Sequence, residues 1–110
     1  MSDDLLQKRC VPCEGGAEPL SKEESFKLMG QVSGWNLRDD YKMIFKEYKF
    51  KNFVAAIDFV RKVADVAEME DHHPDIHIYY SKVILELWTH AIGGLSENDF
   101  IVAAKVDAHK

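Results

Sequence analysis

The stretch EDHHP at residues 70–74 constrains the fold more than any other part of the chain. Before it, apolar residues recur every three and four positions over residues 52–69, which is typical of a helix with one buried face. Pro74 disfavours the helical conformation for His73, so this helix must end close to that residue. After it, the pattern changes to the period of two that is typical of strands. We therefore expect a helix packed on a sheet.

Two further helices are predicted from their capping signals. Ser21 followed by Glu24 forms a capping box for a first helix, and Ser96 followed by Asp99 forms a similar one for a last helix that reaches about residue 108. Alternating or aromatic-rich runs predict four strands, at 35–37, 41–50, 76–80 and 83–90. The sequence predicts an α+β fold in the order α-β-β-α-β-β-α, with a four-stranded antiparallel sheet and three helices on one face.

Some side chains lie outside the expected core faces. Phe59 and Val66 fall off the main apolar stripe of the helix at 52–69, so we expect them to contact a second surface such as another subunit. In the strand pair, Ile76, Ile78 and Tyr80 are expected on the core face. His90 is expected on the opposite face of the sheet, together with Glu86 and His77.

The 110 residues fit a single domain. Residues 1–19 contain Pro and Gly and show no periodicity, so we predict an N-terminal extension that is flexible and lies outside the core. Residues 20–110 form the predicted domain. Cys10 and Cys13 have the CxxC spacing, but a structural zinc site needs four ligands. These thiols are interpreted either as part of a flexible leader or as two ligands of an incomplete metal site.

Charge and hydropathy exclude several classes of protein. The net charge of −5 argues against direct binding to nucleic acid, which requires clustered Lys and Arg. No apolar run approaches the roughly 18 residues that span a membrane. The N-terminus is charged and lacks the apolar region of a secretion signal. We expect a cytoplasmic protein that does not bind membranes.

Five histidines are present, and three of them fall within six residues, at positions 72, 73 and 77. One explanation is a polar turn, where the helix dipole favours a charged histidine near the helix C-terminus. A second is a metal site formed by His72, His73 and His90. A third is general acid–base chemistry, because imidazole titrates near neutral pH and can both donate and accept protons. The residues alone leave these alternatives open.

A wider motif resembles one protein family. Residues 68–74, Thr89-His90 and Gly94-Leu95-Ser96 with Asp99 together resemble the pterin-4a-carbinolamine dehydratases, and the likeness extends from Gly34 through the last helix. The family signature maps onto Glu68, His72, His73, Pro74, an aromatic residue at Tyr79 or Tyr80, His90 and Asp99.

This resemblance implies the dehydration of a 4a-hydroxytetrahydropterin to a quinonoid dihydropterin during tetrahydrobiopterin recycling, without a metal or redox cofactor. It implies that His72 and His90 act as acids near the hydroxyl group and that His73 binds and polarises the pterin. Asp99 is expected to orient His90, to cap the last helix, or to do both. The implied supporting residues are Glu68, Asp71, Pro74, Thr89 and Asp99.

The resemblance also implies partners. Family members are dimers or tetramers, so we expect a homodimer or homotetramer. An aromatic amino acid hydroxylase is a possible partner, because its turnover produces the substrate. Animal members bind a homeodomain transcription factor, so the alternative function is a non-enzymatic partner or regulator protein.

Overall fold

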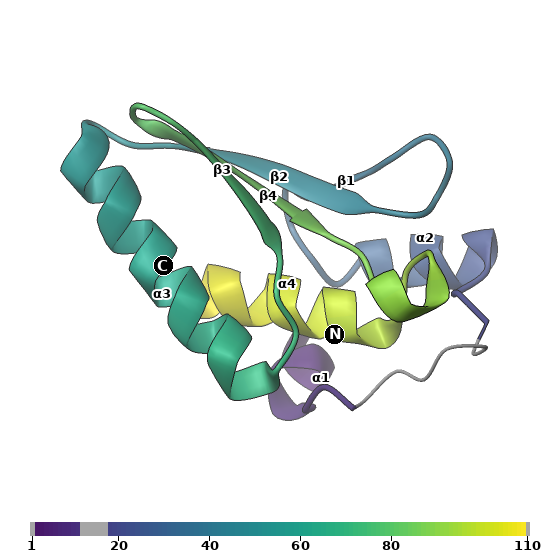
Figure 1. The fold of residues 1–110 in the computed structure, drawn as a ribbon. Helices are drawn as coiled ribbons and strands as arrows, with labels where there is room; N and C mark the ends of the chain where they lie inside the picture. The colour runs from purple at the N-terminus through teal and green to yellow at the C-terminus, as the bar shows by residue number, and fades with distance from the viewer. Residues whose placement is uncertain (1, 12–17, 110) are drawn as a thin grey trace.

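The computed structural model describes residues 2–11 and 18–109, and helices cover one face of its sheet (Figure 1). The elements in chain order are α1 (Ser2–Gln7), α2 (Lys22–Met29), β1 (Asn36–Leu37), β2 (Ile44–Lys49), α3 (Phe53–Glu70), β3 (Asp75–Tyr79), β4 (Lys82–Leu87), the 3-10 helix η1 (His90–Ile92) and α4 (Glu97–His109). The predicted α+β class and the four-stranded sheet are confirmed. Helices α1 and η1 are additions that the sequence analysis did not predict.

The four strands pair antiparallel in the order β1-β2-β4-β3. On β4, Val83, Leu85 and Leu87 are buried against the helices, while the residues between them are partly exposed. This alternation is the period of two predicted for residues 83–87. It leaves the other face of the sheet open to solvent, and the register places Asp75 opposite Glu86 on neighbouring strands.

The helix boundaries follow their predicted signals. The Ser21 side chain and the Glu24 side chain form both hydrogen bonds of the capping box at the start of α2. Asn52 caps α3 by accepting a hydrogen bond from the backbone N–H of Ala55. Helix α3 ends at Glu70, and Asp71 adopts a left-handed conformation with φ 53°. That turn redirects the chain into the extended segment that Pro74 requires.

The interpretation of Phe59 and Val66 as exposed contact residues was wrong. Both are buried, and the Phe59 ring packs on the ring of Tyr48 with centroids 4.5 Å apart. The reason is that α3 contacts both α4 and β4, so its buried face is wider than one stripe. Phe53, which the stripe placed in the core, is instead exposed at the start of the helix.

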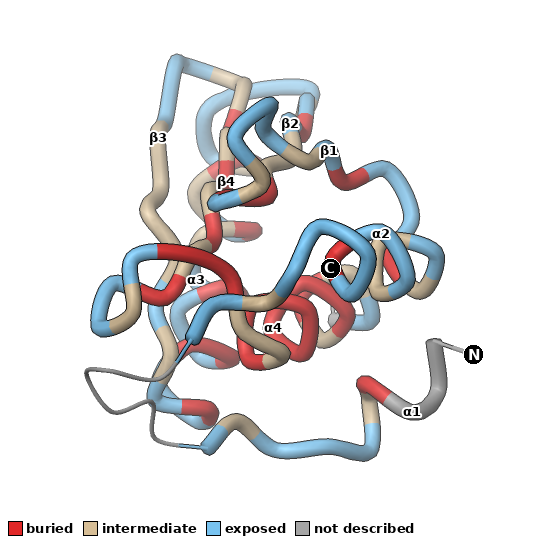
Figure 2. Tube along the Cα trace, turned by 90° about the vertical axis from the view of Figure 1, so that its right-hand side faces the viewer, coloured by how far each residue is buried: buried red, intermediate tan, exposed pale blue. Residues whose placement is uncertain are grey.

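The second hairpin also differs from the prediction. Strand β4 ends at Leu87, so His90 lies in η1 and not in a strand. Ile78 and Tyr80 were expected on the core face, but both are exposed. Tyr80 has φ 54° in the turn between β3 and β4, where Figure 2 shows exposed backbone. Ile78, Tyr79 and Tyr80 therefore expose their side chains to solvent at this end of the hairpin.

The N-terminal segment contributes to the core, which corrects the expectation that residues 1–19 lie outside it. Helix α1 packs against α4, and Leu5 is among the fully buried side chains. The flexibility of the extension and the domain boundary at residue 20 remain predictions. Cys13 lies outside the described residues. Within residues 2–11 and 18–109, no helix has the length and apolar character needed to cross a membrane.

Candidate active site

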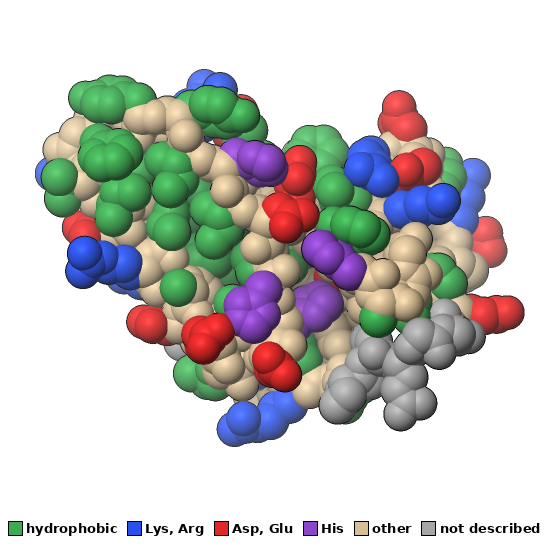
Figure 3. Space-filling view, viewed as in Figure 1, with side chains coloured by type: hydrophobic (Ala, Val, Ile, Leu, Met, Phe, Trp, Pro, Cys, Tyr) green, Lys and Arg blue, Asp and Glu red, His purple; other side chains and the backbone are tan. Residues whose placement is uncertain are grey.

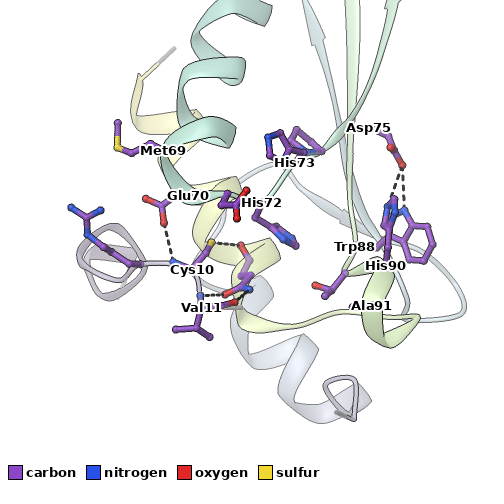
Figure 4. A pocket seen from close by; sticks show the side chains of 15 residues that line it. Cys10, Val11, Met69, Glu70, His72, His73, Asp75, Trp88, His90 and Ala91 are labelled. Carbon is purple, nitrogen blue, oxygen red and sulfur yellow. Dashed lines mark hydrogen bonds and ion pairs between the residues drawn. The ribbon is translucent and has the colours of Figure 1, made fainter. Parts of the chain in front are cut away.

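A cavity of about 730 Å³ opens where the end of α3, the start of β3, η1 and the first turn of α4 meet the N-terminal segment (Figure 4). It brings together the three histidines that the sequence analysis singled out, although they come from two distant parts of the chain. Its lining residues are Arg9, Cys10, Val11, Met69, Glu70, Asp71, His72, His73, Pro74, Asp75, Trp88, Thr89, His90, Ala91 and Asn98.

His72 is the most buried of the three and is paired with Asp99. Its Nε2 lies 2.6 Å from Oδ1 of Asp99, whose side chain is 0% exposed against 13% for His72. The other carboxylate oxygen, Oδ2, accepts hydrogen bonds from the Thr89 hydroxyl at 2.8 Å and from the Ser96 backbone N–H at 3.0 Å. The predicted capping role of Asp99 is therefore confirmed. Its hydrogen-bonded histidine, however, is His72 and not His90 as expected.

His73 and Glu68 form a second pair at the end of α3. Nε2 of His73 lies 2.6 Å from Oε2 of Glu68, and both side chains are largely exposed. Histidine and acidic side chains gather on the same face of the molecule (Figure 3). Because water screens exposed charges, this pair orients the imidazole more than it stabilises the fold.

His90 belongs to a third cluster, with Asp75 and Trp88. Its Nε2 is 4.0 Å from Oδ2 of Asp75, and its ring lies against the Trp88 ring with centroids 3.9 Å apart. The Trp88 indole N–H donates to the same Asp75 oxygen at 3.2 Å. Sequence reasoning missed Asp75 and Trp88. The strand alternation contained the signal, since Trp88 lies two residues from His90 and Asp75 begins the neighbouring strand.

The N-terminal segment forms the remaining wall. The Cys10 backbone N–H donates to Glu70 Oε1 at 2.9 Å, and Lys105 Nζ donates to Glu70 Oε2 at 2.6 Å. Burial raises the pKa of Glu70, but the hydrogen bonds from Lys105 and Cys10 outweigh it and hold that pKa below its usual range. Burial, with the nearby Glu70 carboxylate, raises the pKa of the Cys10 thiol to about 12.

Other residues from the sequence analysis lie away from the cavity. Tyr79 and Tyr80 are exposed at the far end of the hairpin, so neither aromatic position of the signature reaches the site. Trp35 is buried in the core, and its indole N–H donates to Asp107. His77 pairs with Glu86 at 2.9 Å on the open face of the sheet.

The metal hypothesis finds no geometric support in the part of the chain that the structure describes. Over those residues, no three His, Cys, Asp or Glu side chains are placed to share an ion. His72, His73 and His90 each face a separate carboxylate. The arrangement provides three imidazoles at different depths in one open cavity, each able to exchange a proton with a bound molecule.

The fold and site define a small α+β domain that can bind a polar molecule beside several acid–base groups. Residues 18–109 match the sequence profile of the family described as pterin 4 alpha carbinolamine dehydratase. The chain therefore belongs to the pterin-4a-carbinolamine dehydratase family, as its motifs indicated.

Relatives agree with this assignment. A protein of Nitrosospira multiformis is 55% identical over 105 residues, which cover 96% of this chain and 91% of that protein. One of Halorhodospira halophila is 49% identical over 104 residues, covering 94% and 95%. Both carry the name "Putative pterin-4-alpha-carbinolamine dehydratase".

Two solved structures share the fold. One is a transcriptional coactivator/pterin dehydratase from Brucella melitensis, with a TM-score of 0.78 and 33% identity over 83% of this chain and 97% of that one. The other is a pterin dehydratase-like protein identified as a RuBisCO assembly factor of the α-carboxysome, with a TM-score of 0.58 and 25% identity over 68% and 87%. The family fold thus occurs in proteins whose titles name different roles.

Proposed function

We propose that this protein dehydrates 4a-hydroxytetrahydropterin to quinonoid dihydropterin by histidine acid–base catalysis, as a step in tetrahydrobiopterin recycling. In this reaction the bond between C4a and the hydroxyl oxygen breaks, and the oxygen leaves as water after receiving a proton. N5 loses its proton, and a double bond forms between N5 and C4a. One acid and one base are required. The observation that carries the proposal is the meeting of His72, His73 and His90 in one cavity.

His72 is suited to act as a fixed proton carrier. If its Nε2–H is donated to Asp99, its Nδ1 is the nitrogen that exchanges a proton with the substrate. Asp99 cannot rotate away, because Thr89 and Ser96 hold its second oxygen. This pairing stabilises the imidazolium that forms whenever the ring takes up a proton.

The side chains of His73 and His90 are more exposed than that of His72, so both are suited to contact a substrate that enters the cavity from solvent. The His90 ring lies against the Trp88 ring at an interplanar angle of 32°, and Trp88 lines the cavity with an aromatic ring that can stack against a planar pterin. His73 is oriented by Glu68. We propose that His90 shares the acid role at the hydroxyl with His72, and that His73 binds and polarises the pterin.

Covalent catalysis is not part of the proposal. Among the described residues, the thiol that lines the cavity belongs to Cys10. Its pKa of about 12 keeps it protonated at neutral pH. A protonated thiol is a poor nucleophile. Proton transfer by imidazole is sufficient for the loss of water, so the proposed reaction needs neither a metal nor a redox cofactor.

The test is the rate at which freshly generated 4a-hydroxytetrahydropterin loses water, followed by absorbance at neutral pH. We expect acceleration by the wild type and a loss of about 10²- to 10⁴-fold in His72→Ala and His90→Ala, the range typical of general acid–base groups. His77→Ala is the matched control, since His77 also pairs with a carboxylate but lies outside the cavity. Equal rates in all three variants, or no acceleration by a folded wild type, would refute the proposal.

A second candidate function is protein binding, favoured by exposed apolar side chains at the far end of the sheet. Ile78, Tyr79 and Tyr80 on the β3–β4 hairpin are exposed, as are Phe53 and Val54 at the start of α3. Such side chains are typical of contact surfaces. We propose that they support a homodimer or homotetramer, and that an aromatic amino acid hydroxylase is the functional partner. Light scattering of the wild type and Tyr79→Lys tests self-association, and a monomeric wild type would refute it.

A further inference from the structure

The N-terminal segment Arg9–Val11 closes one side of the cavity, although it lies outside the residues that match the family profile. Arg9, Cys10 and Val11 all line the cavity. In Figure 4, Cys10 and Val11 lie beside His72, across the cavity from Trp88 and His90. A molecule that reacts between the histidines therefore has this segment as its neighbour on the opposite side.

Two buried polar side chains hold the segment in place. Asn98, in the first turn of α4, accepts a hydrogen bond from the Val11 N–H at 3.0 Å and donates one to the Val11 carbonyl at 2.6 Å. Glu70 accepts the Cys10 N–H and is held by Lys105. Both Asn98 and Glu70 are buried. Because an unpaired buried polar group is costly, these bonds favour one position of the segment.

The segment brings no suitable proton-transfer group to the reaction. The Cys10 thiol points to the Asn98 backbone carbonyl at 3.6 Å, and an arginine side chain offers hydrogen-bond donors but no acceptor for a proton. A wall that contacts the pterin away from C4a and N5, where bonds change, binds the ground state and the transition state about equally. Its removal should therefore raise KM and leave kcat largely unchanged.

We infer that residues Arg9–Val11 are a substrate-binding wall of the pterin site, and that Asn98 and Glu70 are the positioning residues that hold this wall closed. The inference rests on the proposed function, since it assigns part of the same site. It adds a binding role for a segment that carries none of the signature residues.

The principal test is Val11→Pro in the full-length protein. Proline has no backbone N–H, so the hydrogen bond that Asn98 Oδ1 accepts from residue 11 is lost. The Val11 side chain is exposed and does not belong to the core. We expect KM for the 4a-hydroxytetrahydropterin to rise about 3- to 10-fold, the equivalent of one lost hydrogen bond, with kcat within about twofold of the wild type. Val11→Ala, which keeps the N–H, is the matched control: its KM reports the loss of the side chain alone, and the KM of Val11→Pro should exceed it.

A second variant removes the anchor from the other side. Asn98→Ala should raise KM by a similar or larger factor, because it removes both bonds to Val11. Tyr48→Phe controls for lost stability, since it removes a buried hydrogen bond far from the cavity. Hydrogen exchange at the Cys10 amide reports release of the segment directly, and it should accelerate in Val11→Pro and Asn98→Ala only. The Val11 amide, which Val11→Pro lacks, should also exchange faster in Asn98→Ala.

Two results would overturn the inference. One is an unchanged KM in a variant whose Cys10 amide exchanges faster, because the released segment would then have no role in binding. The other is a Val11→Pro protein whose Cys10 amide stays protected, because the segment would not depend on the proposed anchor. If the wild type catalyses no dehydration, the proposed function fails separately, and the same variants are then compared by fluorescence titration with 7,8-dihydrobiopterin.

Discussion

Each end of α4 carries a carboxylate that interacts with several side chains, but the two carboxylates have different consequences for the protein. Near its start, the Asp99 carboxylate accepts hydrogen bonds from the Thr89 hydroxyl and the Ser96 N–H and is paired with His72. Near its end, the Asp107 carboxylate is surrounded by three other donors, from Trp35, Lys46 and Tyr48. Each carboxylate joins segments that are far apart in the sequence, so each ties the sheet side of the fold to α4.

The difference lies in the partners and in access to solvent. Among the partners of Asp99 is an imidazole that lines an open cavity, and imidazole is the side chain most often used as a general acid or base. The partners of Asp107 are an indole, an ammonium and a phenol, and none of them lines that cavity. Burial and the Asp107 carboxylate raise the pKa of the Tyr48 phenol well above its usual range, so the phenol stays protonated. A buried carboxylate thus supports chemistry only where one of its partners can reach a substrate.

The strongest test of this difference compares the activity of Asp99→Asn with that of Asp107→Asn. We expect Asp99→Asn to lower kcat/KM by about 10²- to 10⁴-fold, because the amide cannot hold His72 and its protonated form as the carboxylate does. Asp107→Asn should stay within about twofold of the wild type. The measurement is the initial rate of carbinolamine dehydration, with circular dichroism to verify folding. An equal loss in both variants would show that the two ends do not differ in function.

The largest stability effect is expected at the other end of the helix. Asp107→Ala leaves the Trp35 indole, the Lys46 ammonium and the Tyr48 hydroxyl without their shared acceptor. We expect it to lower the free energy of unfolding by about 3 kcal/mol, since one of the stranded groups is charged and mostly buried. Urea unfolding followed by tryptophan fluorescence measures this. A loss below about 1 kcal/mol would contradict the assigned network.

Acid sensitivity should appear at the cavity end, through Glu70. Its pKa is lower in the folded protein than its ordinary value of 4.5, so its stabilising contribution is present above that value and is lost as the pH falls through the folded pKa. We expect Glu70→Gln to cost about 2 kcal/mol at neutral pH, because Lys105 loses its partner but remains partly exposed. The difference from the wild type should shrink as the pH falls below 4.5. Urea unfolding between about pH 3 and pH 7, a range that brackets the carboxylate titration, measures it, and a constant difference would contradict the assignment.

Alkaline sensitivity should appear at the far end, through Tyr48. Its pKa is raised in the folded protein, so its contribution is complete below the ordinary value of 10.0 and is lost as the pH rises above it. We expect Tyr48→Phe to cost about 1 kcal/mol at neutral pH, the usual value of one hydrogen bond. Its difference from the wild type should shrink above pH 10.0. The same unfolding experiment tests this, and a difference that grows with pH would be the opposite of the prediction.

Local signals predicted much of the fold. The capping box at Ser21 and the proline at position 74 each act over three or four residues, and both predicted signals were confirmed. The errors occurred where burial depends on distant neighbours. Phe59 is buried because α3 lies against both the sheet and α4, whereas Tyr80 is exposed in the turn between β3 and β4. The hydrophobic periodicity of a single helix or strand reveals neither of these facts.

The candidate site shows the same division. The three histidines were identified from their residue types and spacing, since imidazole chemistry belongs to the side chain itself. The partner of each histidine was less predictable. Asp99 was expected beside His90 but pairs with His72, and the cluster of Asp75 and Trp88 around His90 was missed. These pairings depend on how the turn after α3 and the 3-10 helix η1 face one another.

The sequence by itself determined the period and the order of the main helices and strands, together with the histidine set, because these depend on residues close together in the chain. Only the tertiary structure decided where β4 ends, which carboxylate each histidine faces, and that Leu5 joins the core and Arg9–Val11 the cavity wall. The physical reason is that hydrogen bonds such as those of Asn98 with Val11 join residues 87 positions apart. Their formation requires the whole helix layer to be assembled, and no local pattern encodes it.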